Sequence, residues 1–192
     1  MRDILVITLS SMKGQVRFMN KPLILLVGKS GSGKTTIAKY LQDHYGMAML
    51  ESYTTRKPRY EGEKGHEFVS YEFYLTPSNK VAHTYFDGNH YWATQEQCDN
   101  SDVYVIDPDG VKSFRRNYNS TRPYIIVYLK INALTRVFRM MKRGDGFTKA
   151  VKRILHDRKK FGKFEKDTGV HIIGRDTVQN IAFIIHEKRV GE

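Results

Sequence analysis

Cysteine and long apolar runs are almost absent from this sequence. Cys98 is the only cysteine among 192 residues, which excludes an internal disulfide framework and is typical of a reducing compartment. No apolar run approaches the roughly 18–20 residues that a membrane-spanning helix needs. The opening segment MRDILVITLS is short for a signal core, and Asp3 stands where positive charge is expected. We therefore expect a cytoplasmic protein that does not associate with membranes.

Acidic residues are also scarce. The chain has 20 Asp and Glu against 32 Lys and Arg, so its formal net charge is +12. Much of the excess lies in one block, Arg136–Lys163, which holds eleven basic and two acidic residues. Such a block is typical of binding to nucleic acid, of binding to an acidic small molecule, or of a solvated helix face. Charge alone leaves these three interpretations open.

Short apolar segments alternate with helical patterns along most of the chain. Continuous apolar runs of this length are typical of buried strands, and they cover 23–27, 47–51, 103–106, 124–131 and 171–173. Helical spacing and capping residues predict helices over about 34–45, 133–143, 148–161 and 177–188. The alternation predicts an α/β fold with a mainly parallel sheet, and the length fits a single core.

Residues 52–95 interrupt this alternation. They are rich in Tyr, His, Gly and charged residues, and they show no long helical period. We expect an inserted β-rich or loop-rich segment, supported by a core that consists of residues 21–51 and 96–192. Residues 1–20 precede the first expected core strand, and we interpret them as an N-terminal extension or an additional edge strand.

The segment GKSGSGKT, Gly28–Thr35, matches the pattern G-x-x-x-x-G-K-[ST] at every fixed position, between an apolar strand and a helix. Glycines allow the tight turn in which backbone N–H groups surround phosphates. The lysine reaches the terminal phosphates, and the threonine hydroxyl can hold Mg²⁺. We therefore expect binding of ATP and Mg²⁺ by Gly28, Ser30, Gly31, Ser32, Gly33, Lys34, Thr35 and Thr36.

Asp107 directly follows the apolar segment 103–106. An aspartate at the end of a neighbouring strand usually completes the magnesium site of such a loop. The residues after it, Pro108, Asp109 and Gly110, are equally typical of a turn that needs no metal. We favour Asp107 as the second magnesium ligand, beside Thr35.

Further motifs follow the loop in a fixed order. They are SYTTRKPR (52–59), FVS (68–70), GNHYWAT (88–94), VIDPDGVKSFRR (105–116), RMMKRGD (139–145) and KRIL (152–155). In this order the chain resembles the guanylate kinase family from about Lys21 to its end. That family combines the loop form G-x-S-G-S-G-K-T with S-x-T-T-R-x-P-R, F-V-S and G-N-Y-Y-G-T/S.

The resemblance implies a three-layer P-loop kinase core, a monophosphate-binding insertion at 52–95 and a short lid at about 140–152. It implies phosphoryl transfer from ATP to a nucleoside monophosphate, which is GMP or dGMP in that family. The acceptor-binding residues that it implies are Ser52, Arg56, Arg59, Tyr91, Thr94 and Asp107. The implied residues that act on the donor phosphates are Lys34, Arg139, Arg143 and Arg153.

The sequence departs from the family where the acceptor is recognised. The family has G-x-x-Y-x-F-V-S where this chain has GHEFVS, and Tyr60 or Tyr71 are candidates to replace the missing hydroxyl. VAHTYFDG (81–88) also lacks the glutamate that contacts guanine in the family, so the main guanine-selective contact is lost. Thymidylate, deoxyuridylate and modified nucleotides therefore remain open as acceptors. The candidates for a different base pocket are His83, Thr84, Asp87 and Asn89.

We expect a nucleoside monophosphate kinase that is a monomer or homodimer and does not bind nucleic acid. One alternative is a P-loop kinase or ATPase directed at nucleic acid, with Arg136–Lys163 along the strand. Another is a non-catalytic interaction module of guanylate kinase-like fold. The acceptor motif S-x-T-T-R-x-P-R favours a mononucleotide over nucleic acid, and the intact loop with Lys34 and Thr35 favours an enzyme over a module.

Overall fold

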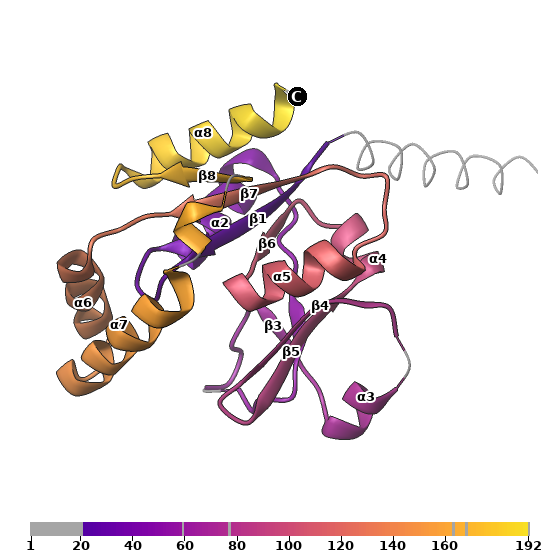
Figure 1. The fold of residues 1–192 in the computed structure, drawn as a ribbon. Coiled ribbons are helices and arrows are strands. Elements are labelled where there is room, and N and C mark those ends of the chain that lie inside the picture. Colours follow the sequence, from indigo (N-terminus) through magenta and orange to yellow (C-terminus); the bar gives the residue numbers. More distant parts are fainter. Residues whose placement is uncertain (1–20, 59, 77, 163, 168, 192) are drawn as a thin grey trace, which may run out of the picture.

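The computed structural model describes residues 21–191 except 59, 77, 163 and 168. The interpretation of residues 1–20 as an extension or edge strand therefore lies outside the described residues. Two sheets and the helices packed beside them make up the described chain (Figure 1). No helix within this part of the chain is long and apolar enough to cross a membrane.

The first sheet contains four parallel strands, in the order β6 (Val103–Val105), β1 (Leu23–Gly28), β7 (Tyr124–Leu129) and β8 (Val170–Ile173). Every residue of the central strand β1 is buried. A strand covered on both faces requires apolar side chains at successive positions, which explains the continuous run LILLV. The mainly parallel sheet expected from the sequence is confirmed.

Helices cover both faces of this sheet. On one face, α2 (Lys34–Tyr45) and α8 (Val178–Val190) share an apolar cluster with one set of β1 side chains. On the other face, α5 (Pro108–Asn117) and the end of α7 (Phe147–Phe161) share a second cluster with the alternate set. Alternate residues of a strand point to opposite faces, so β1 contributes to both clusters. The three-layer α/β core is confirmed.

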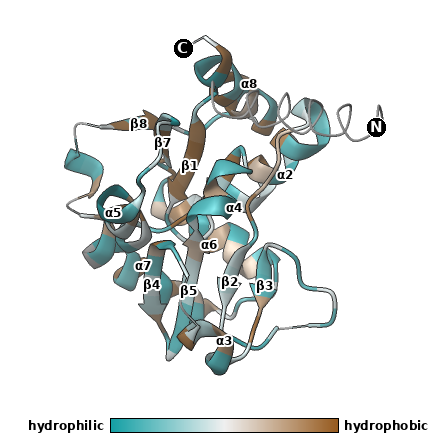
Figure 2. Ribbon diagram, turned by 90° about the vertical axis from the view of Figure 1, so that its right-hand side faces the viewer, coloured by the Kyte–Doolittle hydropathy of each residue, from teal (hydrophilic) through white to brown (hydrophobic). Residues whose placement is uncertain are grey.

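Residues 52–94 contain a second sheet, in the order β3 (His66–Phe68), β2 (Ser52–Thr54), β5 (Asn89–Thr94) and β4 (Lys80–Phe86). β2 and β3 are parallel, and the other pairs are antiparallel. The short helix α3 (Tyr71–Leu75) lies at the end of this sheet away from β1 (Figure 2). The inserted β-rich segment is confirmed.

The basic block lies mainly on two helices, α6 (Ala133–Lys142) and α7, which project from the first sheet (Figure 1). Asn132 caps α6, because its side chain accepts the Thr135 N–H at 2.8 Å. A short 3₁₀ turn, η1 (Phe164–Lys166), follows α7 and leads to β8. In the sequence, α6 and α7 therefore lie between β7 and β8. In the structure, both helices contact the loop that follows β1.

The prediction of a strand over 47–51 is wrong. Only Met49 forms an isolated bridge, to Val103. The Asp102 carboxylate accepts the Ala48 N–H at 2.8 Å, and the buried Arg189 holds that carboxylate. A side-chain bond thus takes a donor that a strand ladder would use.

Candidate active site

The segment Gly28–Thr35 connects the end of β1 to the start of α2, as the motif requires. Gly31 and Gly33 have positive φ angles of 75° and 97°. A Cβ atom on Gly31 would lie 2.8 Å from the Arg136 carbonyl oxygen, and one on Gly28 would lie 2.5 Å from Ser32 Oγ. The turn therefore needs glycine both for its backbone angles and for its close packing.

The loop carries two polar side chains of a kind that can bind an anion, Lys34 and Ser32. The Lys34 ammonium donates to the Gly28 carbonyl at 2.6 Å, which folds the side chain back over the loop. Burial lowers the pKa of Lys34 to about 8, against the opposing effects of Asp157 and Asp107. The Ser32 hydroxyl is buried and has no hydrogen-bond partner among the described residues. A buried hydroxyl in this state fits a ligand that supplies the missing partner.

The helix α7 contacts the loop through Asp157, whose exposed fraction is 6%. Its carboxylate accepts the Ser30 N–H at 2.8 Å and an Arg136 N–H at 2.9 Å. Arg136 is buried as well and donates to the Ser30 carbonyl at 3.3 Å. This pair fixes α6 and α7 against the loop. Sequence reasoning missed it, and no local pattern marks it, because its members lie 21 positions apart.

The three predicted donor-site arginines lie on or beside the α6–α7 pair. Arg139 donates to the Ser32 carbonyl at 3.1 Å, so its guanidinium reaches the loop. Arg143 and Arg153 both pair with Asp145 in the connection between the two helices, at 2.8 and 3.7 Å. The structure therefore brings Arg139 to the loop and holds the other two at one shared carboxylate.

Of the two predicted magnesium ligands, Thr35 is exposed in the first turn of α2. Asp107 caps α5, because Oδ1 accepts the Gly110 N–H at 2.7 Å and the Thr84 hydroxyl at 3.0 Å. The Lys160 ammonium lies 2.6 Å from Oδ2. Mg²⁺ takes oxygen ligands, so the Thr35 hydroxyl fits, whereas Asp107 holds an ammonium where a metal ion would bind. No cluster of three or more metal-binding side chains occurs within the described part of the chain.

One face of the second sheet brings the predicted acceptor residues together. The strand register places Ser52, Tyr91 and Thr84 on this face. Because Thr84 bonds to Asp107, the face is directed toward the end of β6. Ser52 is buried, and its Oγ lies 2.9 Å from His66 Nδ1. We call this surface the acceptor face.

Arg56 lies just beyond β2, where it forms a bidentate pair with Glu63 at 2.9 and 3.1 Å. Its guanidinium also lies over the Phe68 ring, 5.1 Å from the ring centroid. The hydrogen bond to Glu63 raises the pKa of Arg56, and Tyr91 interacts with the same side chain. Arg56 is therefore held in a fixed orientation beside the acceptor face. The predicted partner Arg59 lies outside the described residues.

The candidates for a base pocket separate in space. Thr84 is on the acceptor face, whereas His83 is on the opposite face. There the His83 ring stacks with Tyr74, and its Nε2 lies 2.9 Å from His90 Nδ1. Burial lowers the pKa of both histidines. His83 therefore belongs to the packing beneath α3 rather than to the acceptor face.

The remaining candidates have local structural partners. Asp87, with a φ of 50°, stands in the tight turn between β4 and β5, and its carbonyl accepts from Asn89 Nδ2 at 2.7 Å. The Thr94 hydroxyl caps α4 (Gln95–Asp99) by accepting the Gln97 N–H at 3.3 Å. These bonds give each residue a role in the local fold.

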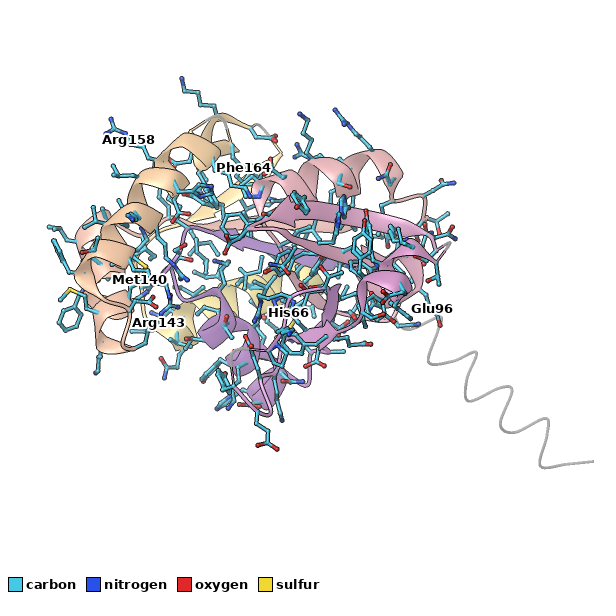
Figure 3. The ribbon with its side chains drawn as sticks, turned by 90° about the horizontal axis from the view of Figure 1, so that it is seen from below. His66, Glu96, Met140, Arg143, Arg158 and Phe164 are labelled. Carbon is cyan, nitrogen blue, oxygen red and sulfur yellow. The ribbon has the colours of Figure 1, made fainter. Side chains whose placement is uncertain are left out.

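His66 is a residue of the acceptor face that sequence reasoning missed. Beyond its bond to Ser52, its ring lies edge-on to Tyr91, with centroids 5.6 Å apart. In the view from below, His66 lies between Arg143 and Glu96 (Figure 3). A signal was present, because His66 stands two residues before Phe68, the tyrosine position of Y-x-F-V-S. Tyr71, an expected replacement, instead contacts His90 on the opposite face, and Tyr60 is exposed.

Comparisons with known proteins give a structural match without a sequence match. No family model matches the chain, and no curated protein matches it. Among solved structures, the guanylate kinase from Anaplasma phagocytophilum superposes with a TM-score of 0.52 at 18% sequence identity. The match covers 90% of this chain and 89% of that chain. The chain therefore has a guanylate kinase-like fold.

Proposed function

We propose that this protein is a nucleoside monophosphate kinase, which transfers the γ-phosphoryl group of ATP to a nucleoside or deoxynucleoside monophosphate. The observation that supports this most directly is the loop after β1. It combines the Lys34 ammonium with the buried, unpartnered Ser32 hydroxyl. Arg139 reaches the same loop, and the acceptor face is linked to the neighbouring strand end through Asp107.

The donor phosphates would bind in the loop, from Gly28 to Thr36. Backbone N–H groups of a loop at a helix N-terminus favour phosphate, and the lysine adds a positive charge. Arg139 would meet the terminal phosphates from α6, and Arg143 and Arg153 would join it from the α6–α7 connection. Phosphoryl transfer requires little covalent chemistry from the protein, so these residues would act by positioning and charge stabilisation.

The magnesium ion that such transfer uses neutralises phosphate charge when bound. Thr35 would hold it through the side-chain hydroxyl. Asp107 would become a ligand only after Lys160 leaves its carboxylate. In the present arrangement Lys160 keeps that carboxylate neutralised and keeps α7 attached to the start of α5.

The acceptor monophosphate would bind on the acceptor face, held by Ser52, Arg56 and Tyr91. Arg56 is suited to this role because its planar guanidinium matches a phosphate and is already oriented by Glu63. The likeness to guanylate kinases favours GMP or dGMP. Because the guanine-contacting glutamate is missing, thymidylate and deoxyuridylate are included as acceptors to be tested.

A coupled assay of ADP release tests the proposal. ATP and Mg²⁺ are supplied with a panel of ribo- and deoxyribonucleoside monophosphates that includes GMP, dGMP, thymidylate and deoxyuridylate. We expect ADP release that depends on at least one of these acceptors. Equal ADP release without any acceptor identifies an ATPase and contradicts the proposal. ATP binding with no transfer to any acceptor contradicts it as well.

A further inference from the structure

One face of α6 exposes large apolar side chains to solvent. Leu134, Phe138 and Met141 are 85%, 68% and 47% exposed. They stand at positions i, i+4 and i+7 of the helix, so their side chains share one face. An amphipathic helix on a folded domain normally buries its apolar face, whereas α6 turns this one outward. We call these three residues the apolar stripe.

The apolar stripe faces away from the phosphate loop. Arg136 and Arg139 mark the side of α6 that meets the loop, because they donate to the Ser30 and Ser32 carbonyls. At about 100° per residue, Phe138 lies about 160° around the helix from Arg136. A ligand in the loop therefore does not cover the apolar stripe, and an occupant of the stripe is a different molecule.

The surroundings of the apolar stripe are positively charged. The exposed lysines of α6 and α7 are Lys142, Lys149 and Lys152. From Ala133 to Phe161 there are two acidic residues, Asp145 and Asp157, and each already pairs with an arginine. The positive charge of the two helices therefore stays largely uncompensated. It complements an occupant that combines negative charge with an apolar phase.

Charge disfavours two occupants that this chain itself could supply. A second copy carries the same formal net charge of +12 and would bring the same lysines to the contact. Residues 1–20 contain three basic residues and one acidic residue, so they are positively charged as well. Like charges placed together at an interface oppose association. The occupant is therefore expected to be another, anionic molecule.

Shape favours a lipid surface over an acidic protein. The apolar stripe lies on a pair of helices that projects from the first sheet (Figure 1). A specific protein interface buries about 800 Å² on each partner, which is more than three side chains supply. Insertion into a lipid headgroup layer needs only a few protruding apolar side chains with cations beside them.

We propose that the apolar stripe docks this protein onto an anionic membrane surface. Leu134 and Phe138 enter the boundary between headgroups and acyl chains, and the exposed lysines remain among the lipid phosphates. The expectation of no membrane association rests on the lack of a spanning segment, which a surface contact does not need. The inference is independent of the proposed kinase activity, because no residue of the stripe belongs to the donor or acceptor site.

Vesicle sedimentation with the full chain tests the inference. The vesicles contain phosphatidylcholine alone, or phosphatidylcholine with about 30% phosphatidylserine. We expect the wild type to bind the anionic vesicles about tenfold or more tightly than the neutral ones. The double variant Leu134→Ser, Phe138→Ser should bind the anionic vesicles about tenfold or more weakly than the wild type. Phe183→Ser removes an exposed side chain from α8 and should bind like the wild type. Thermal unfolding checks that all variants fold.

Tryptophan fluorescence gives a second readout, which reports insertion directly. The chain has a single tryptophan, Trp92, and its side chain is buried, so its emission should not respond to vesicles. In Phe138→Trp, anionic vesicles should move the added emission to shorter wavelength, and lipids brominated on their acyl chains should quench it. Phe183→Trp is the matched control and should show neither effect. The same absence of both effects in Phe138→Trp overturns the inference.

Each competing occupant gives a result of its own, and each of these results overturns the inference. Equal vesicle binding by the wild type and the double serine variant identifies a diffuse electrostatic contact. Lipid-free dimers that the double variant abolishes, measured by analytical ultracentrifugation, identify a second copy. Binding to polyglutamate without binding to anionic vesicles identifies an acidic protein partner.

The kinase proposal is tested separately in the same variants. Without vesicles, the double serine variant should transfer phosphate at the rate of the wild type, because its changes face away from the loop. Loss of vesicle binding at an unchanged transfer rate supports docking through the apolar stripe. If the wild type binds anionic vesicles through the stripe but phosphorylates no nucleoside monophosphate, the docking inference stands and the kinase proposal fails.

Discussion

Lys160 and Asp107 form a direct ion pair between α7 and the start of α5. The ammonium lies 2.6 Å from Asp107 Oδ2 and 2.9 Å from Asp109 Oδ2. Burial of Lys160 lowers its pKa, but the two carboxylates outweigh burial, so the pKa lies above its ordinary value and the ammonium stays charged. The Lys160 ammonium therefore occupies the position beside Asp107 where the sequence predicts a metal ion.

Replacing Lys160 should expose a latent cation site. In Lys160→Met, Asp107 and Asp109 lose their common partner, and we expect the free energy of unfolding to fall by about 1–3 kcal/mol. Added Mg²⁺ should restore part of that loss, because a divalent ion can replace the ammonium between two carboxylates. The measurement is thermal unfolding with and without Mg²⁺. Lys152→Met, at an exposed position on the same helix, is the control. If Mg²⁺ stabilises both variants and the wild type equally, Mg²⁺ does not replace the Lys160 ammonium between Asp107 and Asp109.

Nucleotide affinity should depend on the protonation of Lys34. In the protein without nucleotide, burial lowers the pKa of Lys34 to about 8. The ammonium therefore loses its proton as the pH rises through that value. Bound phosphates favour the charged form, so affinity is steady below pH 8 and falls above it, by up to about tenfold per pH unit. Calorimetric titration with ADP from pH 6.5 to 9.5 measures this. Lys34→Arg stays charged over this range and should bind with a flat profile; a wild-type profile that is equally flat contradicts the assignment.

The buried pair of Asp157 and Arg136 should stabilise the loop. Asp157→Asn leaves the buried Arg136 guanidinium without its counter-charge. Removing one member of a buried pair costs about 3–5 kcal/mol, and we expect a loss near the lower end because asparagine can still accept one bond. Urea unfolding measures the change. Asp167→Asn, in a more exposed pair with Arg115, should cost less than about 1 kcal/mol. Similar losses of stability in both variants would contradict the larger contribution expected of the buried pair of Asp157 and Arg136.

Arg56 and Arg139 should affect different substrates. Arg56 lies beside the acceptor face and Arg139 at the loop. Arg56→Ala should raise the KM of the acceptor about tenfold or more, and Arg139→Ala should do the same for ATP. Steady-state kinetics with each substrate varied in turn measures both constants. The two variants serve as controls for each other, and thermal unfolding checks that both fold. A rise in the same KM for both variants would contradict the division into donor and acceptor sites.

Local patterns were sufficient to predict the glycine-rich turn Gly28–Thr35 and the strand and helix that flank it. A buried parallel strand needs a continuous apolar run, and the turn that follows it needs glycine at positive φ. The residues that determine β1, the loop and α2 are therefore adjacent in the sequence. The expected strand at 47–51 failed because a side chain distant in sequence, Asp102, takes the Ala48 N–H. Sequence periodicity does not record such a competitor.

The acceptor face could be predicted only in part. Which of two neighbours, His83 or Thr84, faces the site depends on the register of β4, and that register shifts at an irregularity between Lys80 and Ala82. The contact of Lys160 with Asp107 joins residues 53 positions apart, so it follows from the packing of α7 and not from any motif. His66 stands at the tyrosine position of the motif Y-x-F-V-S, but the motif is hard to recognise with a histidine at that position.

The central claim is tested most directly by phosphoryl transfer in Lys34→Ala. Labelled γ-phosphate is followed from ATP to whichever nucleoside monophosphate the wild type accepts. Loss of the lysine should lower the transfer rate by about 100-fold or more, because the charge on the terminal phosphates loses its main side-chain partner in the loop. Lys39→Ala, on the exposed side of α2, should transfer at a rate close to that of the wild type. Transfer by Lys34→Ala at a rate near that of the wild type would contradict the assignment of the loop as the donor site.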